Sequence, residues 1–262
     1  HPNTIRVFDF GASDDGVFYL AMEVLDGLDL EELVHRTGPL PAARVLHFGR
    51  QACASLAEAH HRGIVHCDVK PANLFVAKIG EEHDYVKVLD FGLALAPQTG
   101  ASGSTTMVEM RGTPAFMPPE VVRGEPPSPE SDVYAMGAVL YYMLTGQPPF
   151  VEESFHDMVM AQLSATPLAP SARLGRPVPA DLEAVVMRAL AREPRDRFQT
   201  ARELARALQQ QEGQRRQGGE RGEHFPRSGE RQHGRDHQHG RPQNSQRPAS
   251  PRPSKPSTGT SP

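Results

Sequence analysis

The chain has 262 residues, two cysteines and a formal net charge of −4 at pH 7. Two cysteines cannot build the disulfide framework of a small secreted domain, so we expect a reducing, cytoplasmic setting. The longest apolar run, from Tyr134 to Leu144, has 11 residues, whereas a helix that spans a bilayer needs about 20. We therefore expect no membrane span within this chain.

The charge is divided unevenly along the chain. Residues 213–262 carry ten Lys/Arg and four Asp/Glu, a net charge of +6, which leaves −10 for residues 1–212. The only apolar residues in 213–262 are Phe225 and Ala249. Such a segment cannot bury enough apolar surface to offset the entropy lost on ordering, so residues 212–262 are predicted to form a disordered basic tail. Its arginines could attract anionic lipid or nucleic acid, but we favour a solvated linker and expect no sequence-specific nucleic-acid binding.

The first part of the chain predicts two strands followed by two helices. Residues 4–10 and 17–24 alternate or run apolar, with glycine and aspartate between them, which indicates a strand pair joined by a turn. From Asp29 the apolar period becomes helical until Gly38-Pro39 stops it. A longer helical stripe then runs from Pro41 to Gly63.

The middle of the chain predicts short strands and a loop. Apolar runs at residues 64–65, 74–77 and 86–89 are spaced like small strands. Residues 92–111 have little periodicity and many Gly, Ser and Thr, so we expect an exposed loop.

Three helices are predicted in the second half. Residues 128–144 begin with Ser-Pro, a typical helix start, and are apolar on all sides, so this helix should be buried all round. A stripe over residues 182–190 has helical spacing. The capping box of Thr200 with Glu203 opens a last helix, which should end near Gln210.

Two short motifs carry the chemistry. Residues 66–73 read His-Cys-Asp-Val-Lys-Pro-Ala-Asn, and Asp90-Phe91-Gly92 begins 17 residues after Asn73. Phosphoryl transfer needs an acceptor hydroxyl in line, a carboxylate to take its proton, and metal ions to neutralise phosphate charge. Asp68 offers the carboxylate and Lys70 a cation, while Asn73 and Asp90 offer oxygen ligands that suit Mg²⁺.

With these motifs, residues 1 to about 210 resemble a Hanks-type (eukaryotic-like) bacterial Ser/Thr protein kinase. The resemblance implies that Asp68 is the catalytic base, that Lys70 steadies the γ-phosphate of ATP, and that Asn73 and Asp90 hold Mg²⁺. His66 is then a packed structural residue.

The resemblance also implies an α+β, protein-kinase-like fold. Residues 1–25 would be the remnant of the N-lobe and the hinge, with only the last strands of that lobe. Residues 26–211 would be the mainly helical C-lobe, and residues 212–262 the disordered tail.

The hinge region indicates where ATP would bind. Residues 22–25 resemble the gatekeeper and hinge, whose backbone groups would bond adenine, and the residues near the cofactor would be Met22, Glu23, Leu25, Asp29 and Phe75. In this pattern Asp29 lies near the ribose, while Met22 and Phe75 are core residues that also touch adenine.

Three features further along the chain follow the same order. Residues 112–120 resemble the end of the activation loop, where Thr113 would contact the catalytic residues. Asp132 resembles the buried aspartate that holds the catalytic-loop backbone. Arg197 resembles the arginine that pairs with Glu120.

The sequence departs from the family pattern in two places. Cys67 stands where the family commonly has an arginine that pairs with a phosphate on the activation loop, so we expect little ordering of the loop by phosphate. The glycine-rich loop, the ATP-anchoring lysine and the helix glutamate of the family would all precede His1. We therefore expect the chain to be an N-terminally truncated fragment, which has no kinase activity in this 262-residue form.

Other interpretations remain. Taken singly, Asp68 and Lys70 could be a solvated charge pair, and Asn73 and Asp132 could be helix caps. A pseudokinase or scaffold that binds partners without catalysis is the main alternative, although it has no need of Asp68, Lys70, Asn73 and Asp90 together. A small-molecule kinase is disfavoured by Thr113, so the expected partners are proteins with Ser or Thr acceptors.

Overall fold

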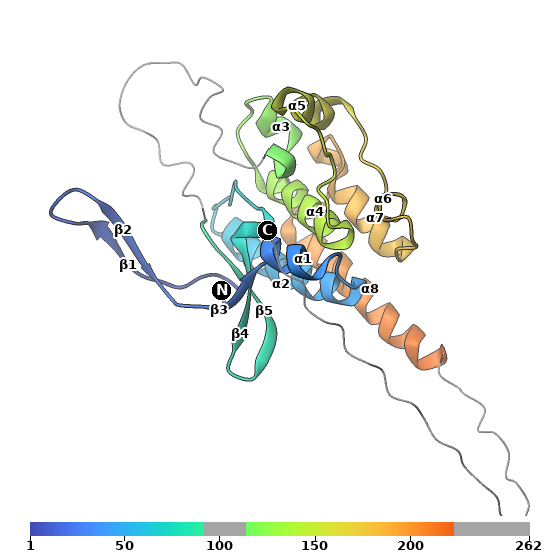
Figure 1. Ribbon diagram of the computed structural model, residues 1–262, viewed down its shortest axis with the longest axis horizontal. Helices are drawn as coiled ribbons and strands as arrows, with labels where there is room; N and C mark the ends of the chain where they lie inside the picture. The colour runs from blue at the N-terminus through green and yellow to red at the C-terminus, as the bar shows by residue number, and fades with distance from the viewer. Residues whose placement is uncertain (92–113, 223–262) are drawn as a thin grey trace, which may run out of the picture. The chain divides into compact units, whose positions relative to one another are not determined.

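The computed structural model describes residues 1–91 and 114–222, with the backbone alone for residues 214–222 (Figure 1). The loop expected at residues 92–111, with Thr113, and the tail beyond Gly222 lie outside these residues. In chain order the elements are β1 (Val7–Ala12), β2 (Phe18–Met22), β3 (Asp26–Asp29), α1 (Leu30–Thr37), α2 (Ala42–His61), the 3₁₀ turn η1 (Pro71–Asn73), β4 (Leu74–Ile79), β5 (Glu82–Val88), the 3₁₀ turn η4 (Pro114–Phe116), α3 (Pro119–Val122), α4 (Pro129–Thr145), α5 (Phe155–Ser164), α6 (Pro170–Leu174), α7 (Ala180–Ala189), the 3₁₀ turn η5 (Pro194–Asp196) and α8 (Ala201–Gly222). The α+β class with a mainly helical body is confirmed.

The strands form two antiparallel sheets. β1 pairs with β2 in a hairpin, and β3, β4 and β5 form a three-stranded sheet in that order. In the second sheet Phe75 lies opposite Asp29 on one side and Lys87 on the other. The strand predicted at residues 64–65 is wrong, because Ile64 donates its N–H to the carbonyl of Ala59 at 3.0 Å and completes the end of α2.

The β1–β2 hairpin carries exposed apolar side chains. All of β2 and most of β1 are exposed, including Phe8, Phe10 and Phe18. An isolated two-stranded hairpin is marginally stable. This one is connected to β5 by the ion pair between Glu23 and Lys87, whose nitrogen and oxygen lie 2.7 Å apart.

Helix α4 is the centre of the helical body. Its side chains are buried almost without interruption from Ser131 to Thr145, and the helix contacts α2, α7 and α8 (Figure 1). Gly137 permits the close packing on α7, because a Cβ at this position would lie 2.7 Å from the Cβ of Ala189. The prediction that this helix is buried all round is confirmed.

The helices begin and end at the signals in the sequence. Asp29 caps α1 by accepting a hydrogen bond from the N–H of Glu32 at 2.8 Å, and Gly38 ends the helix with a φ of 74°. Ser128 caps α4 through a capping box with Ser131. Each cap satisfies backbone groups that a helix end leaves without partners.

Helix α8 is longer than predicted. It begins at the expected capping box but extends to Gly222, twelve residues past Gln210. Eight of residues 211–222 are Gln, Glu or Arg, which have high helix propensity, and the other four are Gly, which has low propensity. The predicted end near Gln210 is therefore wrong for the described backbone. Across residues 1–91 and 114–222, no helix has both the length and the apolar character required to cross a membrane.

Candidate active site

The loop between α2 and β4 brings three predicted site residues together. Lys70 Nζ donates to Asp68 Oδ2 at 2.8 Å. Asn73 Nδ2 donates to the same oxygen at 3.0 Å and to the backbone carbonyl of Asp68 at 2.8 Å. One carboxylate oxygen is thus held by two donors. Among the described residues nothing donates to the other, Oδ1.

Asp132 fixes the backbone of this loop from α4. Its side chain is 1% exposed, and it accepts the N–H of His66 at 2.8 Å and the N–H of Cys67 at 2.9 Å. It also contacts Nε2 of His60, at the end of α2, at 2.8 Å. Cys67 has a φ of 68°, a conformation that is strained for a residue with a Cβ and that persists where the surroundings impose it.

His66 connects the loop to the segment before Asp90. Its Nε2 lies 2.8 Å from the carbonyl oxygen of Leu89, which can only accept, so Nε2 carries the hydrogen. Its Nδ1 accepts the N–H of Asp68 at 3.3 Å. Its ring also packs on Phe91, with the centroids 4.6 Å apart. Both ring nitrogens are used, so the expectation that His66 is structural agrees with its contacts.

Asp90 follows β5, in a segment that lies next to Asn73. The N–H of Leu89 donates to the carbonyl of Asn73 at 2.9 Å, which places the two segments next to each other. Asp90 has a φ of 54° and is exposed. Within the described part of the chain, neither its carboxylate nor Oδ1 of Asn73 accepts a hydrogen bond. Free carboxylate and amide oxygens are the ligands that Mg²⁺ prefers.

The residues expected near adenine form a separate group. Asp29 and Phe75 face each other across β3 and β4, although one oxygen of Asp29 is used in capping α1. The N–H of Glu23 donates to the carbonyl of Arg6 at 3.0 Å, while its side chain binds Lys87. Met22 is 38% exposed at the end of β2. Leu25 lies in the segment of the chain that connects β2 to β3. Within the described residues, no hydrogen bond joins this group to Asp68.

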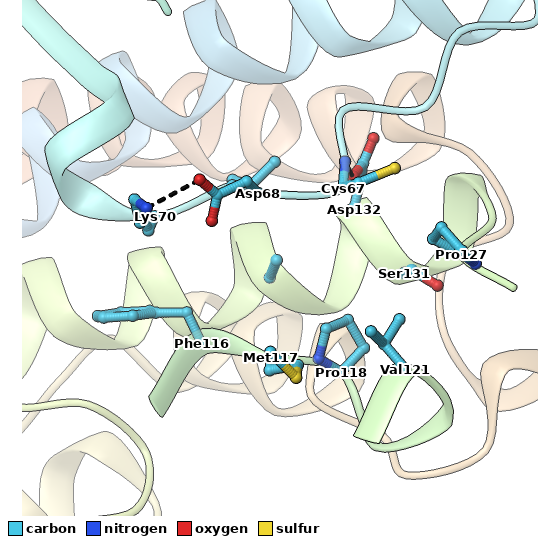
Figure 2. A pocket seen from close by; sticks show the side chains of 12 residues that line it. Cys67, Asp68, Lys70, Phe116, Met117, Pro118, Val121, Pro127, Ser131 and Asp132 are labelled. Atoms are coloured by element: carbon cyan, nitrogen blue, oxygen red, sulfur yellow. Dashed lines mark hydrogen bonds and ion pairs between the residues drawn. The ribbon is translucent and has the colours of Figure 1, made fainter. Parts of the chain in front are cut away.

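A pocket lies beside the loop between α2 and β4. In Figure 2 the loop residues are on one side and the residues from the end of η4 onward are on the other. The labelled side chains that define these walls are Cys67, Asp68, Lys70, Phe116, Met117 and Pro118. Burial, together with the charges of Asp132 and Asp68, raises the pKa of the Cys67 thiol to about 11. Cys67 is therefore a neutral side chain at pH 7.

A buried ion pair supports the same wall from α3. Arg197 is fully buried, and its two terminal nitrogens donate to the two carboxylate oxygens of Glu120 at 2.7 Å each. Its remaining N–H groups donate to the carbonyls of Glu130, Ala191 and Arg192. Burial alone would raise the pKa of Glu120, but hydrogen bonds from Arg197 and Ser131 and the charge of Arg197 hold it below its usual value.

Some residues of the site were not predicted from the sequence. His60, Ser131 and Lys87 each bind a residue that was predicted, yet their partners are Asp132, Glu120 and Glu23, which are distant along the chain. His60 and His66 are six positions apart, and this spacing alone does not indicate that His60 contacts α4. These residues become visible only when the helices are packed.

The comparisons with known proteins agree with this geometry. The model of the protein kinase domain family matches residues 1–211. Ser/Thr-protein kinase PknB of Mycolicibacterium smegmatis is 38% identical over 218 residues, which are 82% of this chain and 34% of PknB. The chain thus spans about one third of the length of this curated relative.

Two solved structures share the fold. The kinase domain of Mycobacterium tuberculosis PknI has a TM-score of 0.60 and 28% identity, and the match covers 81% of this chain and 72% of that one. Rad53 residues 1–466 in complex with AMP-PNP have a TM-score of 0.65 and 26% identity, covering 78% and 50%. The expected protein-kinase-like fold is confirmed, and the chain belongs to the protein kinase domain family, in its bacterial Ser/Thr (Hanks-type) branch.

Proposed function

We propose that the protein containing this domain transfers the γ-phosphate of ATP to Ser or Thr hydroxyls of proteins. The observation that carries the proposal is the arrangement of Asp68. Lys70 and Asn73 hold its Oδ2, which orients the carboxylate and leaves Oδ1 to accept the proton of an acceptor hydroxyl. A base positioned within hydrogen-bond reach of its proton is what general base catalysis requires.

Lys70 has a second role in this proposal. Its ammonium group lies 2.8 Å from Asp68, so the positive charge sits where the acceptor and the transferred phosphoryl group would meet. Such a charge stabilises the transition state, since phosphoryl transfer depends on positioning and on neutralising negative charge.

The chain offers a fitting set of groups for ATP and Mg²⁺. Asn73 Oδ1 and the Asp90 carboxylate would hold the metal ion, which neutralises phosphate charge when bound. The carbonyl of Glu23 and the N–H of Leu25 would bond adenine, with Met22 and Phe75 against the ring and Asp29 near the ribose. We also place the domain in the cytoplasm, because ATP is the phosphate donor and Cys53 and Cys67 are free thiols.

The alternative is a pseudokinase or scaffold that binds partners without catalysis. The 262 residues contain neither a glycine-rich loop nor the strand lysine that kinases use to bind the α- and β-phosphates. Whether the residues encoded before His1 supply both motifs distinguishes the two functions. The oriented carboxylate of Asp68 favours the kinase.

The test compares two proteins, each with an Asp68→Asn control. One is the chain of residues 1–262, and the other also has the residues encoded before His1. Each is incubated with labelled ATP, Mg²⁺ and a generic basic protein. We expect only the longer protein, and not the 262-residue chain, to label Ser and Thr of the basic protein. The Asp68→Asn variant of the longer protein should give at least about a hundredfold less label. Equal labelling by the longer protein and its Asp68→Asn variant would contradict the function.

A further inference from the structure

Helix α5 buries one residue, and that residue is polar. Within Phe155–Ser164 only Gln162 is buried, at 2% exposure, whereas Phe155 and Met160 are 53% and 46% exposed. A helix positioned by apolar packing alone buries its apolar stripe and leaves its amides in water. A specific polar contact must therefore explain why Gln162 faces inward.

That contact is with the segment next to the active site. Gln162 Nε2 donates a hydrogen bond to the carbonyl oxygen of Pro114. The other amide atom, Oε1, is buried and accepts no hydrogen bond in the described part of the chain. Burying an amide oxygen without a partner is unfavourable. A residue that served only to fill space here, such as methionine, would avoid this penalty.

Pro114 is the first residue of the turn η4, and Phe116, the last residue of this turn, begins the pocket wall described above. The carbonyl of Pro114 also accepts the N–H of Met117 at 3.0 Å, so the turn η4 and the Gln162 amide meet at one atom. Phe116 is buried and packs edge-on against Tyr142 with the ring centroids 6.0 Å apart. Phe116 and Met117 then face Asp68 and Lys70 across the pocket (Figure 2).

We propose that Gln162 is a positioning residue for the protein acceptor. The inference rests on the proposed function, because an acceptor hydroxyl near Asp68 must arrive on a polypeptide that passes along the Phe116–Met117 wall. The amide of Gln162 holds the carbonyl of Pro114, at the start of the turn η4 that leads into this wall. The groups assigned to ATP and Mg²⁺ lie on the hinge, β3, η1, β4 and the segment after β5. Across residues 1–91 and 114–222, none of these groups contacts Gln162, so loss of the amide affects the acceptor and leaves the nucleotide unaffected.

The test uses Gln162→Met in the protein that includes the residues encoded before His1. Methionine keeps the length of the side chain and removes both the donor and the unpartnered oxygen, so the fold is retained. The control is Gln210→Met, at an exposed position of α8. We expect the KM for a protein acceptor to rise at least about fivefold in Gln162→Met, while the KM for ATP and the kcat of ATP hydrolysis without acceptor stay within about twofold of wild type.

Two results would overturn the inference. One is an acceptor KM in Gln162→Met equal to that of wild type. The other is a parallel fall in acceptor phosphorylation and ATP hydrolysis, which is the signature of a general structural defect. Gln162→Glu has the same shape without the donor, and it should raise the acceptor KM at least as much as Gln162→Met.

A measurement without catalysis separates this inference from the proposed function. Amide hydrogen exchange in the 262-residue chain should become faster over residues 115–122 in Gln162→Met and stay unchanged over residues 66–73. If the longer wild-type protein phosphorylates no acceptor, the proposed function fails. The exchange experiment still tests whether the hydrogen bond from Gln162 to Pro114 holds this segment. Unchanged exchange over residues 115–122 would then reject the role of Gln162.

Discussion

Arg197 and Glu120 are 77 positions apart in the sequence and form a two-pronged ion pair from which water is excluded. All five N–H groups of the guanidinium have acceptors, and Ser131 donates to the carboxylate at 2.7 Å. A buried ion pair is tolerated when hydrogen bonds replace the lost water, and it becomes costly when one partner is removed.

Glu120→Ala should therefore destabilise the domain strongly. The substitution leaves the Arg197 charge buried without its counter-ion, at a cost of roughly 3–5 kcal/mol in the free energy of unfolding. Urea unfolding measures this loss. Glu125→Ala is the matched control, because its pair with Arg123 lies at the surface, where such pairs contribute less than about 1 kcal/mol. Equal unfolding midpoints for Glu120→Ala and wild type would disprove the contribution of the pair.

The same pair predicts a loss of stability in acid. The pKa of Glu120 in the folded protein lies below its ordinary value of 4.5, so its contribution is complete above pH 4.5 and is lost as the pH falls through the lower, folded value. The gap in unfolding free energy between wild type and Glu120→Ala should shrink from about pH 5 to pH 3. A gap that stays constant over this range would show that Glu120 does not titrate with folding.

Cys67 should react slowly with alkylating reagents despite lining a pocket. A thiol pKa of about 11 instead of 9.0 means roughly a hundredfold less thiolate near pH 8, and the thiolate is the reactive form. Alkylation by iodoacetamide, followed by mass spectrometry, should accelerate about tenfold per pH unit up to that pKa. Cys53, which is fully buried with a pKa raised to about 12, should react more slowly still. Rapid modification of Cys67 at pH 7 in the folded protein would contradict this prediction.

Activation-loop phosphorylation should have little influence on activity. The candidate hydroxyls, Ser102, Ser104, Thr105 and Thr106, lie outside the described residues, and a phosphate orders a loop only if cations receive it. Cys67 is neutral at the position where the resemblance to the family leads us to expect an arginine. Replacing all four hydroxyl residues by Ala in the longer protein should change the rate less than about tenfold.

The variant Cys67→Arg provides the matched comparison for this prediction. It gives a phosphate a fixed partner, so the four Ala replacements should become more damaging in this background. A hundredfold loss with Cys67 intact, on a fold that melts normally, would refute the argument.

Asp90→Asn should abolish phosphoryl transfer by the longer protein through loss of Mg²⁺ affinity. A neutral amide is a poorer ligand than a carboxylate for a hard cation. The measurement is the activity as a function of Mg²⁺ concentration, and any residual activity should require more Mg²⁺ than wild type does. Asp90 makes no hydrogen bond within the described residues, so the melting temperature should stay unchanged. A wild-type Mg²⁺ dependence would exclude Asp90 as a ligand.

The sequence predicted the parts of the fold that local physics determines. Helices α1, α2 and α7 have apolar stripes of helical period, and α4 is apolar on all sides. The ends of α1 and α4 carry caps that act within a few residues. The cluster of Asp68, Lys70 and Asn73 was predictable because all three lie within six positions.

The parts that were missed depend on tertiary pairing. Strand β3 reads Asp-Gly-Leu-Asp, which has no strand pattern, and it is extended because it pairs with β4. Residues 64–65 have an apolar pattern but no partner strand in the sheets described. The sequence does not distinguish His60 and Gln162 from other helix residues, because their contacts with α4 and η4 exist only in the packed structure.

The contacts of Asp132 also set the order in which the site can form during synthesis. The ribosome adds His66 and Cys67 to the chain 66 and 65 residues before Asp132. Synthesis of this stretch takes about 3 to 13 s at typical elongation rates. Until α4 has left the exit tunnel, the catalytic loop has no acceptor for its two backbone N–H groups and no reason to keep the strained conformation of Cys67. A nascent chain that stalls between β5 and α4 therefore contains every predicted catalytic residue, but it lacks the contacts with Asp132 that hold the loop of residues 66–68 in its folded conformation.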